Sequence, residues 1–421
     1  MAPRGASTAR QKRVRALDRR VARAARKVRV LSHLSWPGSV SSAFLRRWRR
    51  GRAALPEVHA RALDAAPIQE PLRAALTELD AADPLQAFLG RTARSYLRAA
   101  ELLATAGTPA FRDASVALFG HPLQPVVPGG PSLLETAQQF IADTEGVDPG
   151  PAPDAPDADA AAAWLRARLA GRFDPPLRVE VTRGLRALAT AGSRRIRLRA
   201  GARFDALTLE QLLQHEALVH AATKRSGRQQ PILSCLGLSS PRTTATQEGL
   251  ATLAEMVTDV MDLHRLRRIA LRVPAVQMAL DGADFIEVFE YFVAHGQAPE
   301  QACMGAARIF RGGDVRGGVV LTKDIVYIGG LMRTHAFLLK AAQAGRPELV
   351  PRLFCGRLTE GDVLALEPAF ADGTIAPALL LPPWVAEDRC LRAWLAWSAF
   401  AHRVPIRSLS LADFAPADSG P

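Results

Sequence analysis

Two short segments carry the strongest chemical signal in this chain: His215-Glu216-Ala217-Leu218-Val219-His220 and Thr246-Gln247-Glu248-Gly249-Leu250-Ala251. Two histidines and one glutamate form a common ligand set for hydrolytic zinc, which keeps a further coordination position open for water. We therefore expect His215, His220 and Glu248 to bind zinc. A glutamate beside the first histidine can accept a proton from water, so we expect Glu216 to be the general base.

Ordinary structural roles are alternatives for each of these residues. The two histidines could be core or surface residues, and Glu248 could be a carboxylate that stabilises the N-terminus of its own helix. Gly249 is expected to let another backbone or a substrate approach closely. Glu255 and Asp259, farther along the same helix, could hold a histidine from behind or belong to a solvated helix face.

The spacing of the two histidines predicts a distortion of the helix that carries them. Thr208 and Gln211 are expected to form a capping box at the start of this helix. His215 and His220 are five residues apart, which in a regular α-helix turns their side chains about 140° away from each other. Because such side chains cannot reach one ion, we expect a π-bulge between Glu216 and His220, a feature often found at functional sites.

The composition is that of a globular protein rather than a disordered or membrane protein. The 421 residues are 48% hydrophobic and 23% charged, which allows a large core. We find no apolar run long enough to cross a bilayer and no apolar signal-peptide core at the N-terminus, so we expect a cytoplasmic protein. The four cysteines are far apart in the sequence, which argues against a disulfide framework and against a thiolate zinc site.

The net charge of +13 is concentrated at the N-terminus. Residues 1–52 hold 16 of the 54 Lys and Arg and a single acid, Asp18, so the rest of the chain has a net charge near zero. We expect a basic arm at residues 1–34, with an amphipathic helix over residues 10–31. This arm could bind nucleic acid or an anionic surface, or it could be a solvated segment that packs lightly on its own domain.

The order of the predicted elements indicates a mainly α fold of the α+β class, with a zincin-like metallopeptidase domain. Pro56, Pro71 and Pro84 lie where helices are expected to begin. Helices are expected near residues 40–51, 57–79, 84–106, 108–118, 160–171 and 328–342, and strands of a small sheet at residues 177–182 and 196–199. The expected regions are a helical N-terminal region at 35–144, a linker or surface loop at 145–160, a catalytic domain at 161–400 and a C-terminal tail at 401–421.

Several motifs resemble one known family. They are the two segments quoted above, Thr223, Gly227, Gln230-Pro231, Phe111 to Ser115, Gly120-His121-Pro122, Arg308 to Gly313, and Thr322 to Tyr327. In these residues the chain resembles the QEGLA-motif family, whose bacterial members are described as flavohaemoglobin-expression-modulating proteins. That family is similar to the microtubule-associated tyrosine carboxypeptidases, zinc metallopeptidases with a His-Glu-x-x-x-His motif. The resemblance covers roughly residues 35–385 and excludes the basic arm.

The resemblance implies the same zinc ligands and the same general base, and it adds a requirement. A carboxypeptidase must bind the terminal carboxylate of its substrate and stabilise an oxyanion. The candidates for carboxylate binding are Arg308, Arg311, Arg316 and Lys323, which surround a glycine-rich turn pattern. Tyr327 is the candidate oxyanion donor. Surface arginines and a core tyrosine are the alternative interpretation of these residues.

We therefore predict a zinc-dependent metallopeptidase of carboxypeptidase type that acts on a peptide or protein C-terminus. One alternative is a regulatory or nucleic-acid-binding protein that uses its basic arm and has a structural or vestigial metal site. No helix-turn-helix or other base-reading signature accompanies the basic arm. A further alternative, an amidase or hydrolase of small molecules, uses the same metal chemistry.

Overall fold

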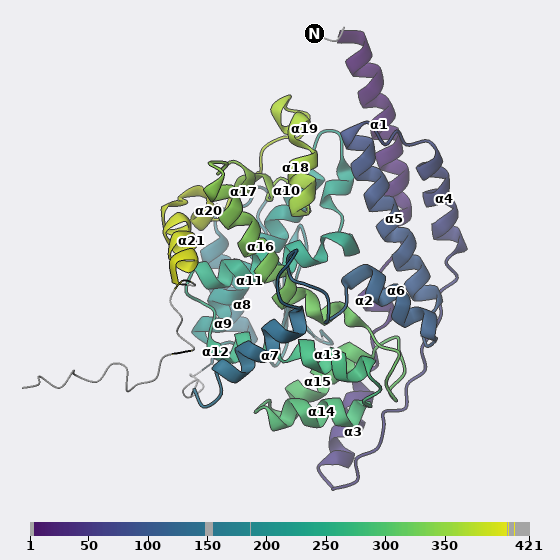
Figure 1. Ribbon diagram of the computed structural model, residues 1–421, viewed down its shortest axis with the longest axis vertical. Helices are drawn as coiled ribbons and strands as arrows, with labels where there is room; N and C mark the ends of the chain where they lie inside the picture. The colour runs from purple at the N-terminus through teal and green to yellow at the C-terminus, as the bar shows by residue number, and fades with distance from the viewer. Residues whose placement is uncertain (1–3, 148–154, 186, 402, 404–407, 409–421) are drawn as a thin grey trace, which may run out of the picture.

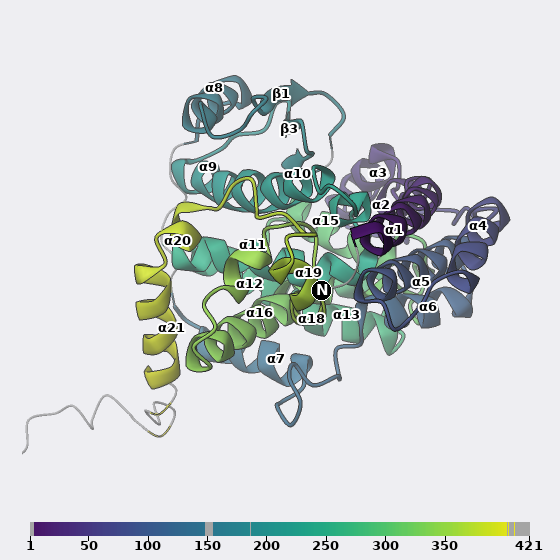
Figure 2. The same cartoon turned by 90° about the horizontal axis from the view of Figure 1, so that it is seen from above.

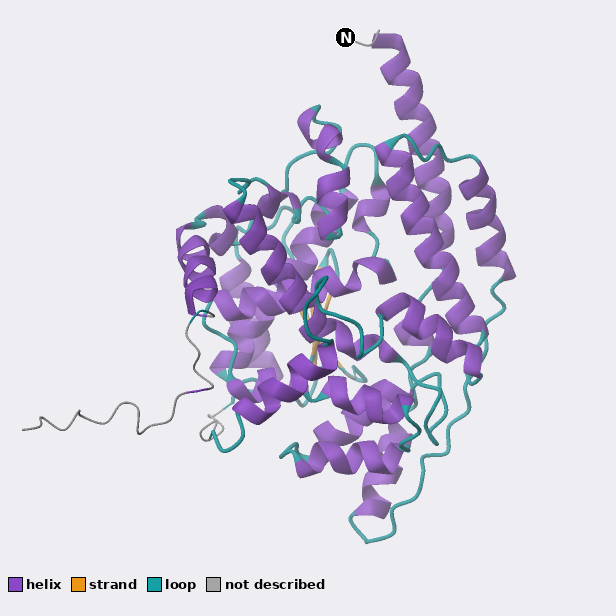
Figure 3. Cartoon of the chain, viewed as in Figure 1, coloured by secondary structure: helices purple, strands orange, loops and turns teal. Residues whose placement is uncertain are grey.

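The computed structural model is mainly α-helical, with one small sheet (Figures 1 and 3). It describes residues 4–147, 155–185, 187–401, 403 and 408. The predicted fold class is therefore confirmed. Among the described residues, no helix is long and apolar enough to cross a membrane. Most of the predicted tail, and residues 148–154 of the predicted linker, lie outside the described residues.

The helical N-terminal region has the elements α1 (Arg4–Ala25), α2 (Val30–His33), α3 (Gly38–Trp48), α4 (Ala66–Thr77), α5 (Pro84–Ala104), α6 (Pro109–Phe119) and α7 (Leu133–Asp143). Helices α1, α4, α5 and α6 lie together along one side of the molecule (Figure 1). The predicted helix at 57–79 begins only at Ala66. The residues before it run extended beside α5, where Leu63 donates a backbone hydrogen bond to Leu103 at 3.0 Å.

The basic N-terminal segment is an amphipathic helix, as predicted, but it is not a solvated arm. Val14, Leu17 and Val21 of α1 are at most 2% exposed and belong to the largest core cluster. Asp18 is 2% exposed and accepts backbone hydrogen bonds from Ser234 at 2.9 Å and Cys235 at 2.8 Å. The helix is therefore an integral part of the core.

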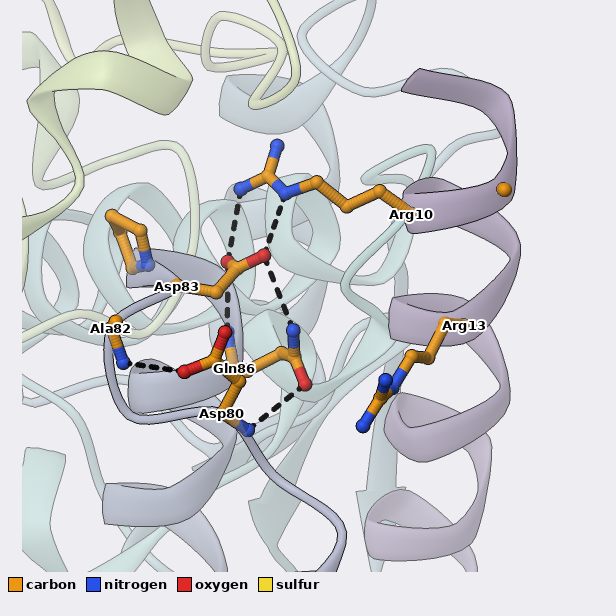
Figure 4. A pocket seen from close by; sticks show the side chains of 8 residues that line it. Arg10, Arg13, Asp80, Ala82, Asp83 and Gln86 are labelled. Carbon is orange, nitrogen blue, oxygen red and sulfur yellow. Dashed lines mark hydrogen bonds and ion pairs between the residues drawn. The ribbon is translucent and has the colours of Figure 1, made fainter. Parts of the chain in front are cut away.

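Arginines on the outer side of α1 also bind to the protein itself. Arg10 forms an ion pair with Asp83, the residue that caps α5, with 2.6 Å between Arg10 Nε and Asp83 Oδ2. This pair borders a pocket of about 620 Å³ (Figure 4). Arg20 forms an ion pair with Glu78 at 2.7 Å. Two of the α1 arginines therefore have partners within the protein, and nothing in the described residues supports a nucleic-acid partner.

The sheet lies against the helix that carries the histidines. Helix α8 (Ala158–Leu169) begins within the predicted linker, with Asp157 as its N-cap. The strands β1 (Arg178–Thr182), β2 (Ala189–Ala191) and β3 (Arg195–Arg199) follow in the order β1-β3-β2. Strand β3 pairs parallel with β1 and antiparallel with β2, a short strand that the sequence pattern did not predict.

The remaining elements begin with α9 (Ala206–Leu212), the π-helix η1 (Leu213–Ala221), α10 (Ala222–Arg228), and the 3-10 helices η2 (Ser234–Gly237) and η3 (Pro241–Thr243). They continue with α11 (Thr244–Val257), α12 (Leu263–Ala270), α13 (Arg272–Leu280), α14 (Phe285–Ala294), α15 (Pro299–Phe310), η4 (Thr322–Ile325) and α16 (Val326–Gln343). The last are α17 (Leu349–Arg352), α18 (Glu360–Ala365), α19 (Glu367–Ala371), α20 (Pro383–Ala386) and α21 (Arg389–Ala401).

The π-helix is held between two layers. Figure 2 shows α8 and the sheet on one side of α9 and α10, with α11 and α16 on the other. Leu218 of η1 belongs to the core cluster that includes the sheet, whereas Val219 belongs to the cluster that includes α1, α5 and α11. Two neighbouring residues of η1 are therefore buried in two different core clusters. This packing fixes the rotation of η1 and so the direction in which its histidines point.

Candidate metal centre

The structure confirms the predicted distortion of the histidine helix. Residues Leu213–Ala221 form a π-helix, in which hydrogen bonds run from residue i to i+5. Residues five apart therefore lie about one turn apart on the same face. The rings of His215 and His220 are 4.7 Å apart, with 88° between their planes. The predicted capping box is wrong, because Asp205 caps α9 by accepting a hydrogen bond from Thr208 at 2.6 Å.

The third predicted ligand reaches the histidines from α11. Glu248 lies beyond the first turn of this helix, in which no acidic residue occurs, so the dipole-stabilising interpretation is wrong. Gly249 confirms the expected close approach of a backbone. A Cβ atom at this position would lie 2.2 Å from the carbonyl of Gly330 on α16, so the two helices touch through their backbones.

The three side chains converge on one point. Glu248 Oε2 lies 3.6 Å from His215 Nε2 and 3.6 Å from His220 Nε2. These distances are too long for hydrogen bonds. With metal bonds of about 2.0–2.1 Å in a tetrahedral arrangement, two zinc ligands are about 3.3 Å apart. The observed separations exceed this value by a few tenths of an ångström. The spacing of the three side chains therefore suits a shared metal ion better than direct hydrogen bonds between them.

A buried carboxylate holds His215 from behind. Glu255 is fully buried, and its Oε1 lies 2.6 Å from His215 Nδ1. Arg265 of α12 binds the same carboxylate, with 2.5 Å between Arg265 Nη2 and Glu255 Oε1. A proton on Nδ1 leaves the lone pair of Nε2 free to face Glu248, which is the tautomer that a metal ligand needs. His220 differs, because its buried Nδ1 has no hydrogen-bond acceptor among the described residues.

The charges of the group favour cation binding. Burial raises the pKa of Glu248, but Lys323 and the two histidines outweigh burial and hold this pKa well below its ordinary value. Burial lowers the pKa of His215, but Glu248 and Glu255 outweigh it and raise this pKa to about 10. Burial lowers the pKa of His220. A metal ion bound by Nε2 of His215 would therefore have to displace the proton that Glu248 and Glu255 favour on this imidazole.

Glu216 meets the spatial requirements of a general base. It is half-buried, and within the described parts of the chain its carboxylate has no hydrogen bond or ion pair. It follows His215 directly on η1 and acts electrostatically on both histidines. A carboxylate that is near the ligands and not committed to another partner is available to a water molecule.

Lys323 and Tyr327 lie next to Glu248. Lys323 is 6% exposed, and its Nζ lies 3.8 Å from Glu248 Oε1 and 5.1 Å from the centre of the Tyr327 ring. Arg308 donates a hydrogen bond from Nη2 to the Tyr327 hydroxyl at 3.2 Å. Burial and Glu248 raise the pKa of Tyr327, but Lys323 and Arg308 outweigh them and lower it. The phenol therefore accepts from Arg308 and keeps its own O–H for another acceptor.

The other predicted carboxylate-binding arginines are placed differently. Arg308 is committed to the buried Asp324, with 2.5 Å between Arg308 Nε and Asp324 Oδ2. Arg311 is the C-cap residue of α15. The Arg316 side chain is 79% exposed and faces Asp314 at 3.8 Å. Of the four predicted residues, the structure thus brings Lys323 next to the ligands.

Other cations near the site carried no sequence motif. Arg272 stacks over the Tyr327 ring at 4.9 Å, and Arg357 acts electrostatically on Glu216 and Glu248. Burial, together with the nearby Arg357 and Arg228, lowers the pKa of Lys224 to about 8. Of these, only Lys224 could be inferred from spacing, because it follows His220 by four residues on the same helix.

A variant of Glu255 tests the role of the carboxylate behind His215. We expect Glu255→Gln to weaken zinc binding by about 10- to 100-fold, because the orientation and basicity of the His215 imidazole depend on that carboxylate. Competition with a chelator of known affinity measures this change. Glu78→Gln, at a side chain that is 52% exposed, is the matched control. Unchanged zinc affinity in a folded Glu255→Gln protein would contradict the assignment.

The protein is thus a mainly helical protein in which two histidines of a π-helix and a glutamate of the neighbouring helix form a group that could hold a metal ion. The sequence pattern of the family described as microtubule-associated tyrosine carboxypeptidase matches residues 43–403. The chain therefore belongs to the microtubule-associated tyrosine carboxypeptidase family. A comparison with curated protein sequences gives no match. Membership confirms the resemblance seen in the motifs and implies a carboxypeptidase-like function.

Proposed function

We propose that the protein is a zinc-dependent carboxypeptidase that hydrolyses the C-terminal peptide bond of a peptide or protein. The observation that supports this most is the convergence of His215, His220 and Glu248, with the family match as independent support. Two imidazoles and one carboxylate are the donor set of hydrolytic zinc rather than of magnesium or calcium, which prefer oxygen ligands. When bound, zinc would polarise the scissile carbonyl and make water more acidic.

In this proposal the residues around the ligands move protons and hold charge. Glu216 accepts a proton from the attacking water and then delivers it to the nitrogen of the departing amino acid, so the carboxylate is restored at the end of each cycle. Tyr327 donates its O–H to the oxygen of the scissile carbonyl as negative charge develops there. Lys323 adds positive charge beside the same oxygen and holds Glu248 in its ionised form.

The arginines contribute by fixing these groups in place. Arg308 forms an ion pair with the buried Asp324, and it orients the Tyr327 hydroxyl. Arg265 holds Glu255, and Glu255 holds His215. Such support keeps donors and ligands within the narrow geometry that catalysis needs. The roles of Arg311 and Arg316 stay sequence predictions.

The proposal is tested by metal content and by the product. The purified protein is expected to bind about one zinc ion per chain and to release single residues from the C-terminus of unstructured peptides, as followed by mass spectrometry. Removing the metal with a chelator should stop the release, and adding zinc should restore it. Release that continues at full rate in metal-free protein would contradict the proposal.

A further inference from the structure

Two cations that belong to no recognised motif lie at the end of the metal-site helix. Lys224 of α10 follows His220 by one helical turn. Arg357 lies in the turn between α17 and α18, more than a hundred residues farther along the chain. Its Nη2 donates a hydrogen bond to the main-chain oxygen of His220 at 3.3 Å. Arg357 also acts electrostatically on Glu216 and Glu248, although no ion pair joins it to either carboxylate.

The backbone around Arg357 is fixed firmly. Arg357 donates a backbone hydrogen bond to Leu236 of η2 at 2.7 Å. A Cβ atom on the preceding Gly356 would lie 2.9 Å from the Leu236 Cβ, so the turn packs tightly on η2. With the backbone and one Nη atom held, little of the usual arginine side-chain freedom is left to lose when a ligand binds.

In the part of the chain that the structure describes, Lys224 and Arg357 have few partners for their positive charges and N–H groups. Among the described residues, no carboxylate lies within ion-pair distance of Lys224 or Arg357. The Arg357 Nε is buried and has no hydrogen-bond acceptor among them. By contrast, Arg308 has Asp324 and Lys323 has Glu248 as partners. Lys224 and Arg357 are both partly buried, so each keeps less hydration than a surface cation, and a bound anion would compensate for this loss.

We propose that Arg357, assisted by Lys224, binds the α-carboxylate at the C-terminus of the peptide substrate and so restricts hydrolysis to the last peptide bond. This inference depends on the proposed carboxypeptidase function. A guanidinium presents parallel N–H groups that match a carboxylate, and the adjacent ammonium adds a point charge. Because Arg357 is anchored to the helix that carries the two histidine ligands and the base, a carboxylate bound there holds the neighbouring peptide bond near the reacting groups.

The test compares two peptides that differ only in a free or amidated C-terminus. We expect the zinc-loaded wild-type protein to prefer the free acid strongly. In Arg357→Gln, KM for the free acid should rise about 50-fold while kcat changes little, so that the preference over the amide is mostly lost. Arg357→Lys should keep part of the preference. Arg392→Gln, at an arginine whose side chain is 61% exposed, is the control and should behave as wild type.

Binding is measured separately from hydrolysis. In the Glu216→Gln background, calorimetry should show that the free acid binds more tightly than the amide, and Arg357→Gln should remove this difference. If Arg357→Gln does not fold or loses zinc, Lys224→Gln decides the question, with an expected loss of preference of about fivefold. An unchanged preference in the folded variant, or an equal fall of kcat for both peptides, would overturn the inference.

Different results would contradict the proposed carboxypeptidase function and the proposed carboxylate recognition. Zinc-loaded wild-type protein that neither cleaves nor binds either peptide would overturn the proposed carboxypeptidase function itself. Wild-type protein that cleaves the free acid and the amide equally well would retain peptide hydrolysis as the activity but would overturn carboxylate recognition by Arg357 and Lys224.

Discussion

Glu216→Gln is expected to lower kcat/KM for peptide hydrolysis by about 1,000-fold while zinc stays bound. Glutamine has nearly the same size and keeps the half-buried position, but it cannot accept a proton from water at neutral pH. The ligands His215, His220 and Glu248 are not changed, so the zinc content should remain that of the wild type. Steady-state hydrolysis of a C-terminal residue, together with metal analysis of the same sample, measures both quantities.

The control for this prediction is Glu300→Gln, the same substitution at a side chain that is 57% exposed and forms an ion pair with Arg49. It should leave both hydrolysis and zinc content unchanged. Full activity in the Glu216→Gln protein would remove Glu216 from the role of general base. Loss of both activity and zinc would show instead that Glu216 supports the ligands.

The core of the candidate site could be predicted because its information is local. The five-residue spacing of His215 and His220 conflicts with a regular α-helix, and a π-helix resolves the conflict. For Glu255 the sequence left two alternatives, a contact with a histidine or a place on a solvated helix face. The structure resolves this choice, because Glu255 is fully buried with a 2.6 Å contact to His215 Nδ1 rather than on a solvated face.

The cations around the ligands could not be predicted because their positions depend on distant parts of the chain. The resemblance favoured arginines near a glycine-rich turn as carboxylate-binding residues. The Arg316 side chain at this turn is 79% exposed. Arg357 reaches the metal site through a turn that packs on η2, a contact between segments far apart in sequence. Periodicity and motif spacing carry no information about such contacts.

The same limit applies to the fold. The amphipathic pattern at residues 10–31 correctly predicted a helix, but a net charge count favoured a solvated arm. The buried Asp18 explains the difference, because its carboxylate binds the backbone of η2 and ties α1 to the core. A single buried acid in a basic segment is therefore more informative about packing than the excess of arginines around it.

Gly249→Ala is expected to destabilise the protein strongly. The added Cβ would lie 2.2 Å from the backbone of Gly330, and neither helix can move away without separating α11 from α16. We expect the free energy of unfolding to fall by about 3 kcal/mol or more, as for severe overpacking of a core. Chemical denaturation followed by circular dichroism measures this change.

The matched control for Gly249→Ala is Gly90→Ala in the interior of α5, where the added Cβ would make only ordinary contacts, the nearest at 3.5 Å. Alanine there should stabilise the protein slightly, by about 0.5–1 kcal/mol, because it restricts the unfolded chain and favours the helix. Where Gly249→Ala protein still folds, zinc affinity should fall as well, because separating the two helices moves Glu248 away from the histidines and from Lys323. Wild-type stability and zinc affinity in Gly249→Ala would show that the close contact of α11 with α16 is not what positions the third ligand.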